Sequence, residues 1–192
     1  MQEMGVPPVW QVFCGASPSD LAERLIAIGA EKVVDLSCMW GAPGDLVQTP
    51  DVPGVLARAC ESEADVETYA RLYPLLFDVP LDDWIETVVS AELALFRRPV
   101  DRFRRWLAFE GDKPIAAGAV FDHKGTAVLA TLLTLPECRN RGIGAALMSR
   151  ALQDLIGAGC TSMSVVAGPG ADRLYARMGF KEVGRGAVLM WP

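Results

Sequence analysis

One strand–loop–helix segment constrains the fold more than any other part of the sequence. Residues 126–135 form an apolar run of the kind found in buried strands. A short loop follows, and after it apolar side chains recur at every fourth position, which predicts an amphipathic helix. These apolar positions are Ile143, Leu147, Ala151 and Leu155.

The loop between strand and helix carries two arginines and two glycines in the sequence Arg139-Asn140-Arg141-Gly142-Ile143-Gly144. Helix starts leave backbone N–H groups unpaired and carry partial positive charge, so such a loop can bind a phosphate or pyrophosphate. Glycines would let this ligand approach the backbone closely. A Walker A loop is excluded because no Gly-Lys-Ser/Thr follows. The alternative is a helix start built from small residues for packing.

Composition narrows the classes of partner. No apolar run in the 192 residues is long enough to span a bilayer, and the N-terminal residues lack the features of a signal peptide. Five cysteines without metal-ligand spacing suit a reducing cytoplasm, where we expect the protein to reside. His123 is the single histidine, so we expect no metal. A net charge of −6 argues against nucleic acid and favours amines, with Arg139 and Arg141 as a local basic exception.

Periodicity predicts further elements on both sides of this segment. Strands are expected at 9–13, 33–40, 55–60, 103–110, 114–122, 161–167, 180–183 and 187–191. Helices are expected at 20–28 with Ser17 as N-cap, at 61–77 with a break at Pro74, and at 80–93 and 171–178. Other features are an elbow at 77–79, a turn at 184–186, and a Gly- and Pro-rich loop at 41–53 that is the best candidate for a domain boundary.

Two motifs and the element order resemble those of the GNAT N-acetyltransferase superfamily. Arg139-x-x-Gly142-x-Gly144 resembles its pyrophosphate loop, and Leu174-Tyr175 followed by Gly179-Phe180 is similar to its Leu-Tyr-x-x-x-Gly-Phe motif. The resemblance implies an α/β (α+β) GNAT fold. Such a fold has a mixed, mostly antiparallel sheet with a splayed central strand pair and flanking helices.

We expect residues 51–192 to form the GNAT domain, preceded by an N-terminal β-α-β segment in residues 1–50. Residues 25–33 can be aligned with residues 175–183, which places Gly29 on Gly179 and Leu25 on Tyr175. This alignment indicates a possible degenerate half-GNAT repeat with a structural role. The alternative is that any strand–helix–Gly–strand segment aligns in this way.

The resemblance also implies a site for acetyl-CoA. In the family, the strand before the loop pairs its backbone with the pantetheine arm, and a backbone N–H holds the thioester oxygen. Those positions here are Leu132, Leu133 and Thr134. The pyrophosphate would bind the amides of Arg139, Asn140, Arg141, Gly142, Ile143, Gly144 and Ala145.

Tyr175 is the residue that the resemblance assigns to protonating the departing CoA thiolate. The alternative is a buried aromatic that only packs. Many relatives have an asparagine before this helix that contacts the cofactor, and here Gly168-Pro169-Gly170 replaces it.

The general base is left open, because residues 126–134 contain no carboxylate. The candidates are a water chain, an acceptor with a low amine pKa, and the side chains of Asp122, His123, Asp78, Asp82 and Asp83. His123, in a tight turn, is better explained as a solvated surface residue. Cys138 beside the loop has no adjacent base, so we expect it to be inert.

The sequence therefore predicts an N-acetyltransferase in which a primary amine attacks the thioester of acetyl-CoA directly. We expect a small cationic or amino-acid-like acceptor, with no nucleic-acid or membrane partner. The alternatives are acetylation of a protein N-terminus or lysine, and a non-catalytic acyl-CoA sensor. By analogy with the family, exposed terminal strands predict a possible homodimer.

Overall fold

The computed structural model describes residues 8–72, 84–98 and 102–191. The chain divides into two compact units. The central unit is Ala42–Met163, and the terminal unit joins Met1–Gly41 with Ser164–Pro192. The expected division into residues 1–50 and 51–192 stays a prediction.

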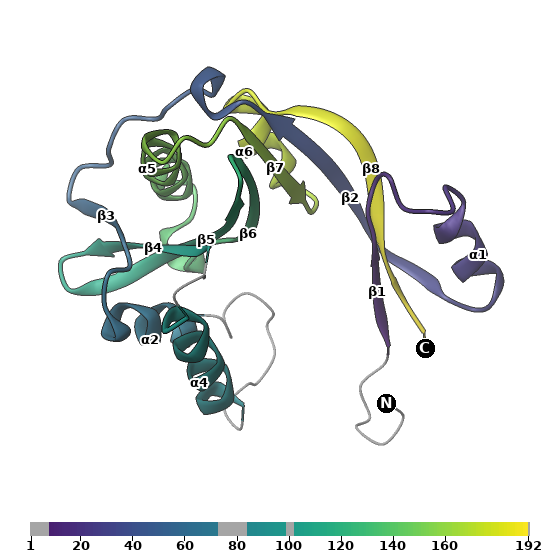
Figure 1. The fold of residues 1–192 in the computed structure, drawn as a ribbon, viewed down its shortest axis with the longest axis horizontal. Coiled ribbons are helices and arrows are strands. Elements are labelled where there is room, and N and C mark those ends of the chain that lie inside the picture. The colour runs from purple at the N-terminus through teal and green to yellow at the C-terminus, as the bar shows by residue number, and fades with distance from the viewer. Residues whose placement is uncertain (1–7, 73–83, 99–101, 192) are drawn as a thin grey trace. The chain divides into compact units, whose positions relative to one another are not determined.

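The central unit is built on an antiparallel sheet in which consecutive strands are neighbours. Its strands are β3 (Val55–Ala59), β4 (Phe103–Glu110), β5 (Lys113–His123) and β6 (Thr126–Thr134), in the order β6-β5-β4-β3 (Figure 1). Gly111 has a positive φ in the β4–β5 turn, as do Lys124 and Gly125 in the β5–β6 turn. Both turns lie between strands expected from the sequence, and β4 has the predicted bounds.

Helices cover both faces of this sheet. The face that packs against α2 (Glu63–Leu72) and α4 (Ile85–Phe96) is opposite the face covered by α5 (Ile143–Gly157), as Figure 1 shows. β5 is therefore buried on both sides, and the residues between Ile115 and Val120 other than Gly118 are fully buried apolar side chains. This explains why β5 is a continuous apolar run without alternation. Short 3-10 helices, η2 (Pro43–Asp45) and η3 (Pro136–Cys138), lie in the connections.

The terminal unit contains two β-α-β segments. The first is β1 (Val9–Val12), α1 (Leu21–Ala27) and β2 (Glu31–Gly41). The second is β7 (Ser162–Ala167), which begins at the end of the central unit, then α6 (Asp172–Arg177) and β8 (Lys181–Met190). The strand order β1-β8-β2-β7 places each segment's first strand beside the last strand of the other segment.

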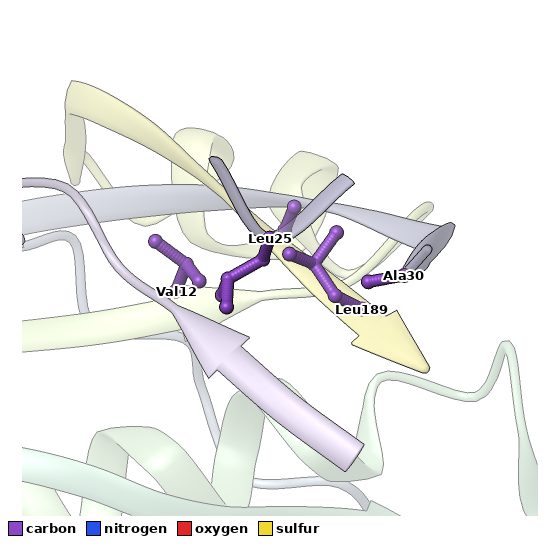
Figure 2. Close-up of a cluster of buried hydrophobic side chains, with 5 residues drawn as sticks. Val12, Leu25, Ala30 and Leu189 are labelled. Carbon is purple, nitrogen blue, oxygen red and sulfur yellow. The ribbon is translucent and has the colours of Figure 1, made fainter. Parts of the chain in front are cut away.

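A small apolar core holds α1 against this sheet. Figure 2 shows Leu25 of α1 among Val12, Ala30 and Leu189. Leu189 is fully buried, and Ala187 completes the cluster. The helix ends where expected, at Gly29, whose φ is +103°.

The ladder between β2 and β8 is symmetric about one residue pair, Leu36 opposite Gly186. Each paired residue of β2 corresponds to the residue of β8 whose number is 150 higher. The pair Glu31–Met190 at one end of the ladder therefore corresponds to the pair Trp40–Lys181 at the other end. The ladder has two irregularities, which leave Val33 unpaired in β2 and Val183 unpaired in β8, and the same shift exchanges them.

The helices that precede β2 and β8 end in the same way. The Ala30 N–H donates to the Leu25 carbonyl at 3.1 Å, and the Phe180 N–H donates to the Tyr175 carbonyl at 3.0 Å. This is a common way to close a helix with a left-handed glycine. The symmetry is what the predicted repeat requires, and a common origin of the two segments stays a prediction.

Two local predictions were wrong. The turn expected at 184–186 does not exist, because β8 continues through it. A Cβ at Gly186 would lie 2.4 Å from the Val12 carbonyl oxygen, so this glycine allows β1 to approach β8 and does not mark a turn. Ser17 is not the N-cap of α1: Asp20 is, and the Leu21 N–H donates to the carbonyl of Pro18, which puts Pro18 in the turn before the helix.

The elbow at 77–79 and the break at Pro74 lie outside the described residues. Within the described ranges, no helix is long and apolar enough to cross a membrane.

Candidate cofactor site

The N-terminus of α5 has the backbone geometry of an anion site. Gly142 is its N-cap with a φ of +80°, and Asn140 before it has a φ of +60°. The first helical hydrogen bond of α5 runs from the Ala146 N–H to the Gly142 carbonyl at 3.0 Å. The amides of residues 143–145 therefore have no partner within the helix. The first turn carries no acidic residue, and no side-chain hydrogen bond caps Gly142 among the described residues.

The same segment is open to solvent on one side and fixed on the other. Arg139, Asn140, Arg141 and Gly142 are exposed. The next side chain, Ile143, is 1% exposed and belongs to the core under α5. The loop is thus held in place by an apolar side chain while its backbone and its two arginines face outward.

The end of β6 lies against the loop, through contacts of Thr134 with Arg139 and Gly144. Arg139 Nε–H donates to the carbonyl oxygen of Thr134 at 3.2 Å. A Cβ at Gly144 would lie 3.3 Å from Thr134 Oγ1, closer than most Cβ contacts in proteins. Glycine at 144 therefore lets the strand and the helix start approach each other.

Arg141 is engaged by a residue that the sequence did not single out. Its guanidinium forms a salt bridge with Glu110, at the end of β4, with an Nη2–Oε1 distance of 2.5 Å. The hydrogen bond from Arg141 lowers the pKa of the Glu110 carboxyl. Lys113 pairs with Glu137 nearby at 3.0 Å, so the β4–β5 hairpin is joined to the loop by two ion pairs. No local pattern places this hairpin beside the loop.

The Gly- and Pro-rich segment before β3 lies along α5. The Thr49 N–H donates to Ser149 Oγ at 2.8 Å, and Gln153 donates to Gln48 at 2.9 Å. Val52 reaches the loop itself, since its Cγ2 would be 3.8 Å from a Cβ at Gly142. The sequence spacing puts Ser149 on the polar face of the helix, opposite Ile143 and Leu147. It is nevertheless 2% exposed, because this segment covers it.

Tyr175 lies in α6 of the terminal unit and is 5% exposed. Its ring packs edge-to-face on Phe180, with ring centroids 5.8 Å apart. Burial raises the pKa of the phenol well above its ordinary value, so the side chain keeps its proton at neutral pH. That is the protonation state a proton donor needs, although the position of Tyr175 relative to the loop stays a prediction.

Comparison with known proteins decides the family. The family model described as "Acetyltransferase (GNAT) family" matches residues 69–180, more than half of the chain. The chain belongs to the GNAT acetyltransferase family. No curated protein sequence matches it.

Solved GNAT structures agree with this fold. A GCN5-related N-acetyltransferase from Kribbella flavida has a TM-score of 0.72 and 22% identity, over 100% of this chain and 70% of that one. A GCN5-related N-acetyltransferase from Sphaerobacter thermophilus has a TM-score of 0.67 and 18% identity, over 96% of this chain and 59% of that one. AAC(6')-Iy, in complex with the bisubstrate analog CoA-S-monomethyl-acetylneamine, has a TM-score of 0.57 and 18% identity, over 68% and 92%. The GNAT fold expected from the sequence is confirmed. The expected splaying of the central strand pair concerns β6 and β7. Because the division between the two units falls within β7, this splaying stays a prediction.

The strand that precedes the GNAT loop has ordinary side chains, as expected. Leu133 is buried in the core, and Leu132 lines a small apolar cavity under α5 together with Leu147 and Met148. An irregularity in the β5–β6 ladder leaves Ala130 without a partner. The roles expected for the backbone of residues 132–134 toward a thioester stay predictions.

Of the candidate bases, two can be placed. Asp122 is bound to Arg104, with an Nη2–Oδ2 distance of 3.0 Å, and so is already engaged by a cation. His123 is exposed, in agreement with the prediction of a surface residue. Asp78, Asp82 and Asp83 lie outside the described residues.

The structure adds a buried carboxylate in α4 that the sequence did not reveal. Glu92 pairs with Arg105 of β4 at 2.6 Å, and the Arg105 side chain is 1% exposed. The sequence did not predict that Glu92 would be buried, because the apolar pattern of this helix did not show which face points toward the sheet.

Cys138 is buried in η3, and its expected inertness stays a prediction. In the described part of the chain, no three His, Cys, Asp or Glu side chains are grouped so that they could hold a metal ion.

Proposed function

We propose that this GNAT protein is an N-acetyltransferase that moves the acetyl group of acetyl-CoA to a primary amine. The observation that carries the proposal is the start of α5, where unpaired amides, exposed glycine and two arginines meet the end of β6. A diphosphate needs N–H donors and positive charge that can approach it without steric hindrance. The CoA-containing analog bound by AAC(6')-Iy supports CoA as the donor.

In the proposed reaction, the amine nitrogen attacks the thioester carbonyl, a C–N bond forms and the C–S bond breaks. The pyrophosphate binds the amides of residues 139–145, and the backbone around Leu133 and Thr134 holds the oxygen on which negative charge develops. Tyr175 gives its proton to the CoA thiolate, and the amine loses a proton to water or to a carboxylate. In each step the protein contributes mainly by holding the thioester, the amine and the Tyr175 phenol in the correct geometry.

We propose a small cationic or amino-acid-like acceptor, because a net charge of −6 attracts amines. A cytoplasmic location is supported by cysteine usage, since all five cysteines are free thiols.

Calorimetric titration of acetyl-CoA tests the cofactor site. We expect Arg139→Ala to weaken binding by roughly 10-fold or more, since a charge-assisted hydrogen bond contributes about 1.5–3 kcal/mol. Arg150→Ala is the matched control: it lies on α5, is exposed and pairs with Asp154 rather than facing the loop. If both variants bind acetyl-CoA as the wild type does, the site is misplaced.

A second function, an acyl-CoA sensor, is favoured by the absence of any carboxylate on β6 and by the pairing of Asp122 with Arg104. Release of free CoA thiol across a panel of small amines, amino acids and lysine peptides separates the alternatives. Turnover that falls sharply in Tyr175→Phe supports the enzyme, and the best amine identifies the acceptor class. Saturable acetyl-CoA binding without turnover on any amine or peptide would favour the sensor.

A further inference from the structure

Two cysteines distant in sequence meet in the terminal unit. Cys14 is exposed in the loop after β1, and Cys38 is buried in β2. The Cys14 N–H donates to Cys38 Sγ at 3.3 Å. Since the N–Cα bond is about 1.5 Å long, the Cys14 Cα lies within about 5 Å of the Cys38 sulfur.

Gly184 explains why the two side chains come together. It is the residue of β8 directly opposite Cys38 in the ladder. A Cβ built on Gly184 would lie 2.5 Å from the Cys14 Cβ and 3.3 Å from its sulfur. Cys14 therefore occupies the space where a side chain of residue 184 would contact Cys38. A disulfide requires Cβ atoms about 3.5–4.5 Å apart, and Cys14 already lies over the position from which residue 184 would face Cys38.

The electrostatics agree with thiols in contact. The pKa of the Cys14 thiol is raised, first by a hydrogen bond with the Cys38 thiol and then by burial. The thiols of Cys60 and Cys160 instead donate to backbone carbonyls, of Asp65 at 4.0 Å and Ser162 at 3.3 Å.

We propose that Cys14 and Cys38 are a redox site that closes to a reversible disulfide. A small disulfide oxidant such as oxidised glutathione first exchanges with the accessible Cys14, which becomes a mixed disulfide and releases one glutathione thiol. The Cys38 thiolate then attacks the Cys14 sulfur and releases the second glutathione thiol. The protein loses two hydrogens, and one oxidised glutathione becomes two reduced ones. Closure ties residues 13–20 to the β2–β8 ladder.

Oxidised glutathione in mildly alkaline buffer tests the site on the full chain. We expect an intact mass lower by two hydrogens, a cross-linked peptide pair containing Cys14 and Cys38, and recovery of the starting mass with dithiothreitol. The melting temperature of the oxidised form should rise by several degrees, because the link shortens the unfolded chain.

Cys14→Ser should abolish the two-hydrogen loss, and Cys60→Ser, at a half-buried cysteine away from the pair, should preserve it. Gly184→Ala should slow closure by displacing Cys14. The proposal is overturned if glutathione stays attached to Cys14 in the wild type, or if Cys14→Ser still loses two hydrogens.

Discussion

Gly142 and Gly144 belong to one motif, yet the structure gives them different reasons to be glycine. Gly142 has a φ of +80°, which other L-residues rarely adopt, and its surroundings leave space for a methyl group. Gly144 lies within the helix and is limited by Thr134 Oγ1 at 3.3 Å. The first glycine is required by the backbone, whereas the second only relieves a close contact with a neighbouring side chain.

We therefore expect Gly142→Ala to lower the free energy of unfolding by about 1–2 kcal/mol, the cost of a left-handed conformation. Gly144→Ala should stay within about 0.5 kcal/mol of the wild type, because gained helix propensity offsets the close contact with Thr134. Urea unfolding of both variants measures this difference. Equal losses would mean that φ is not what selects glycine at 142.

Cys60 provides a test of pH dependence. Burial is the main reason that its thiol pKa is raised to about 12, compared with about 8.5 for an exposed thiol. Between these values the folded protein holds a proton that the unfolded chain releases. Stability is therefore fully present below about pH 8.5 and falls as pH rises through this window, by up to about 1.4 kcal/mol per pH unit.

Urea unfolding of the wild type and Cys60→Ala between about pH 8 and pH 10 isolates this contribution, since other titrating groups are common to both. The two curves of unfolding free energy should converge as pH rises. Parallel curves would show that Cys60 titrates normally.

At the scale of elements, the Glu92–Arg105 ion pair connects α4 to β4. Arg105 also lies over two aromatic rings, with its guanidinium carbon 4.4 Å from the Phe103 centroid and 5.8 Å from that of Tyr69. A buried cation of this kind is tolerated only while its carboxylate partner is present.

Glu92→Ala should cost about 3–5 kcal/mol of unfolding free energy, because it leaves Arg105 charged and buried. Glu86→Ala is the matched control in the same helix. Its carboxylate pairs with Arg71 at 3.0 Å but is largely exposed, so we expect a loss below about 1 kcal/mol. Chemical denaturation of both variants measures the contrast. Similar small losses would show that water reaches the Glu92–Arg105 pair.

The elements themselves were largely predictable, because their signals are local. β4 has the bounds expected from the sequence, and α5 follows from apolar spacing. The failures depend on distant contacts. Ser149 is buried because Thr49 lies on it, and β8 is continuous because β2 pairs with it through Gly184 and Gly186. In the candidate site, the sequence motif predicted the position of the loop. It did not predict that Glu110 and Val52 lie beside the loop, because they belong to distant segments and no local pattern encodes that contact.

At the scale of the whole molecule, β8 is paired on both edges, by β1 and by β2. The expectation of a homodimer rested on exposed terminal strands, of which β1 is the edge strand of the sheet and β8 is not. A homodimer stays a prediction. Pairing of two chains through β8 would first require β1 or β2 of the same chain to be displaced.

Gly186→Ala tests how much the N-terminal strand β1 contributes. The added methyl would meet the Val12 carbonyl oxygen at 2.4 Å, a backbone atom that cannot move alone, so we expect β1 to detach and the unfolding free energy to fall by at least about 2 kcal/mol. Gly44→Ala has open space and should be nearly neutral. Hydrogen exchange at residues 9–12 should become fast only in Gly186→Ala. Retained protection there would show that β1 can shift without detaching.

The symmetric ladder of β2 and β8 has a consequence for how such a protein can change. In a dimer of identical chains, every substitution appears at both symmetry-related positions at once. Here a single chain encodes both halves of the two-fold arrangement, so each half can mutate independently. Leu25 and Tyr175 occupy corresponding places before corresponding glycines. One half can therefore serve the core with a leucine, while the other carries a phenol, the group proposed above as the proton donor.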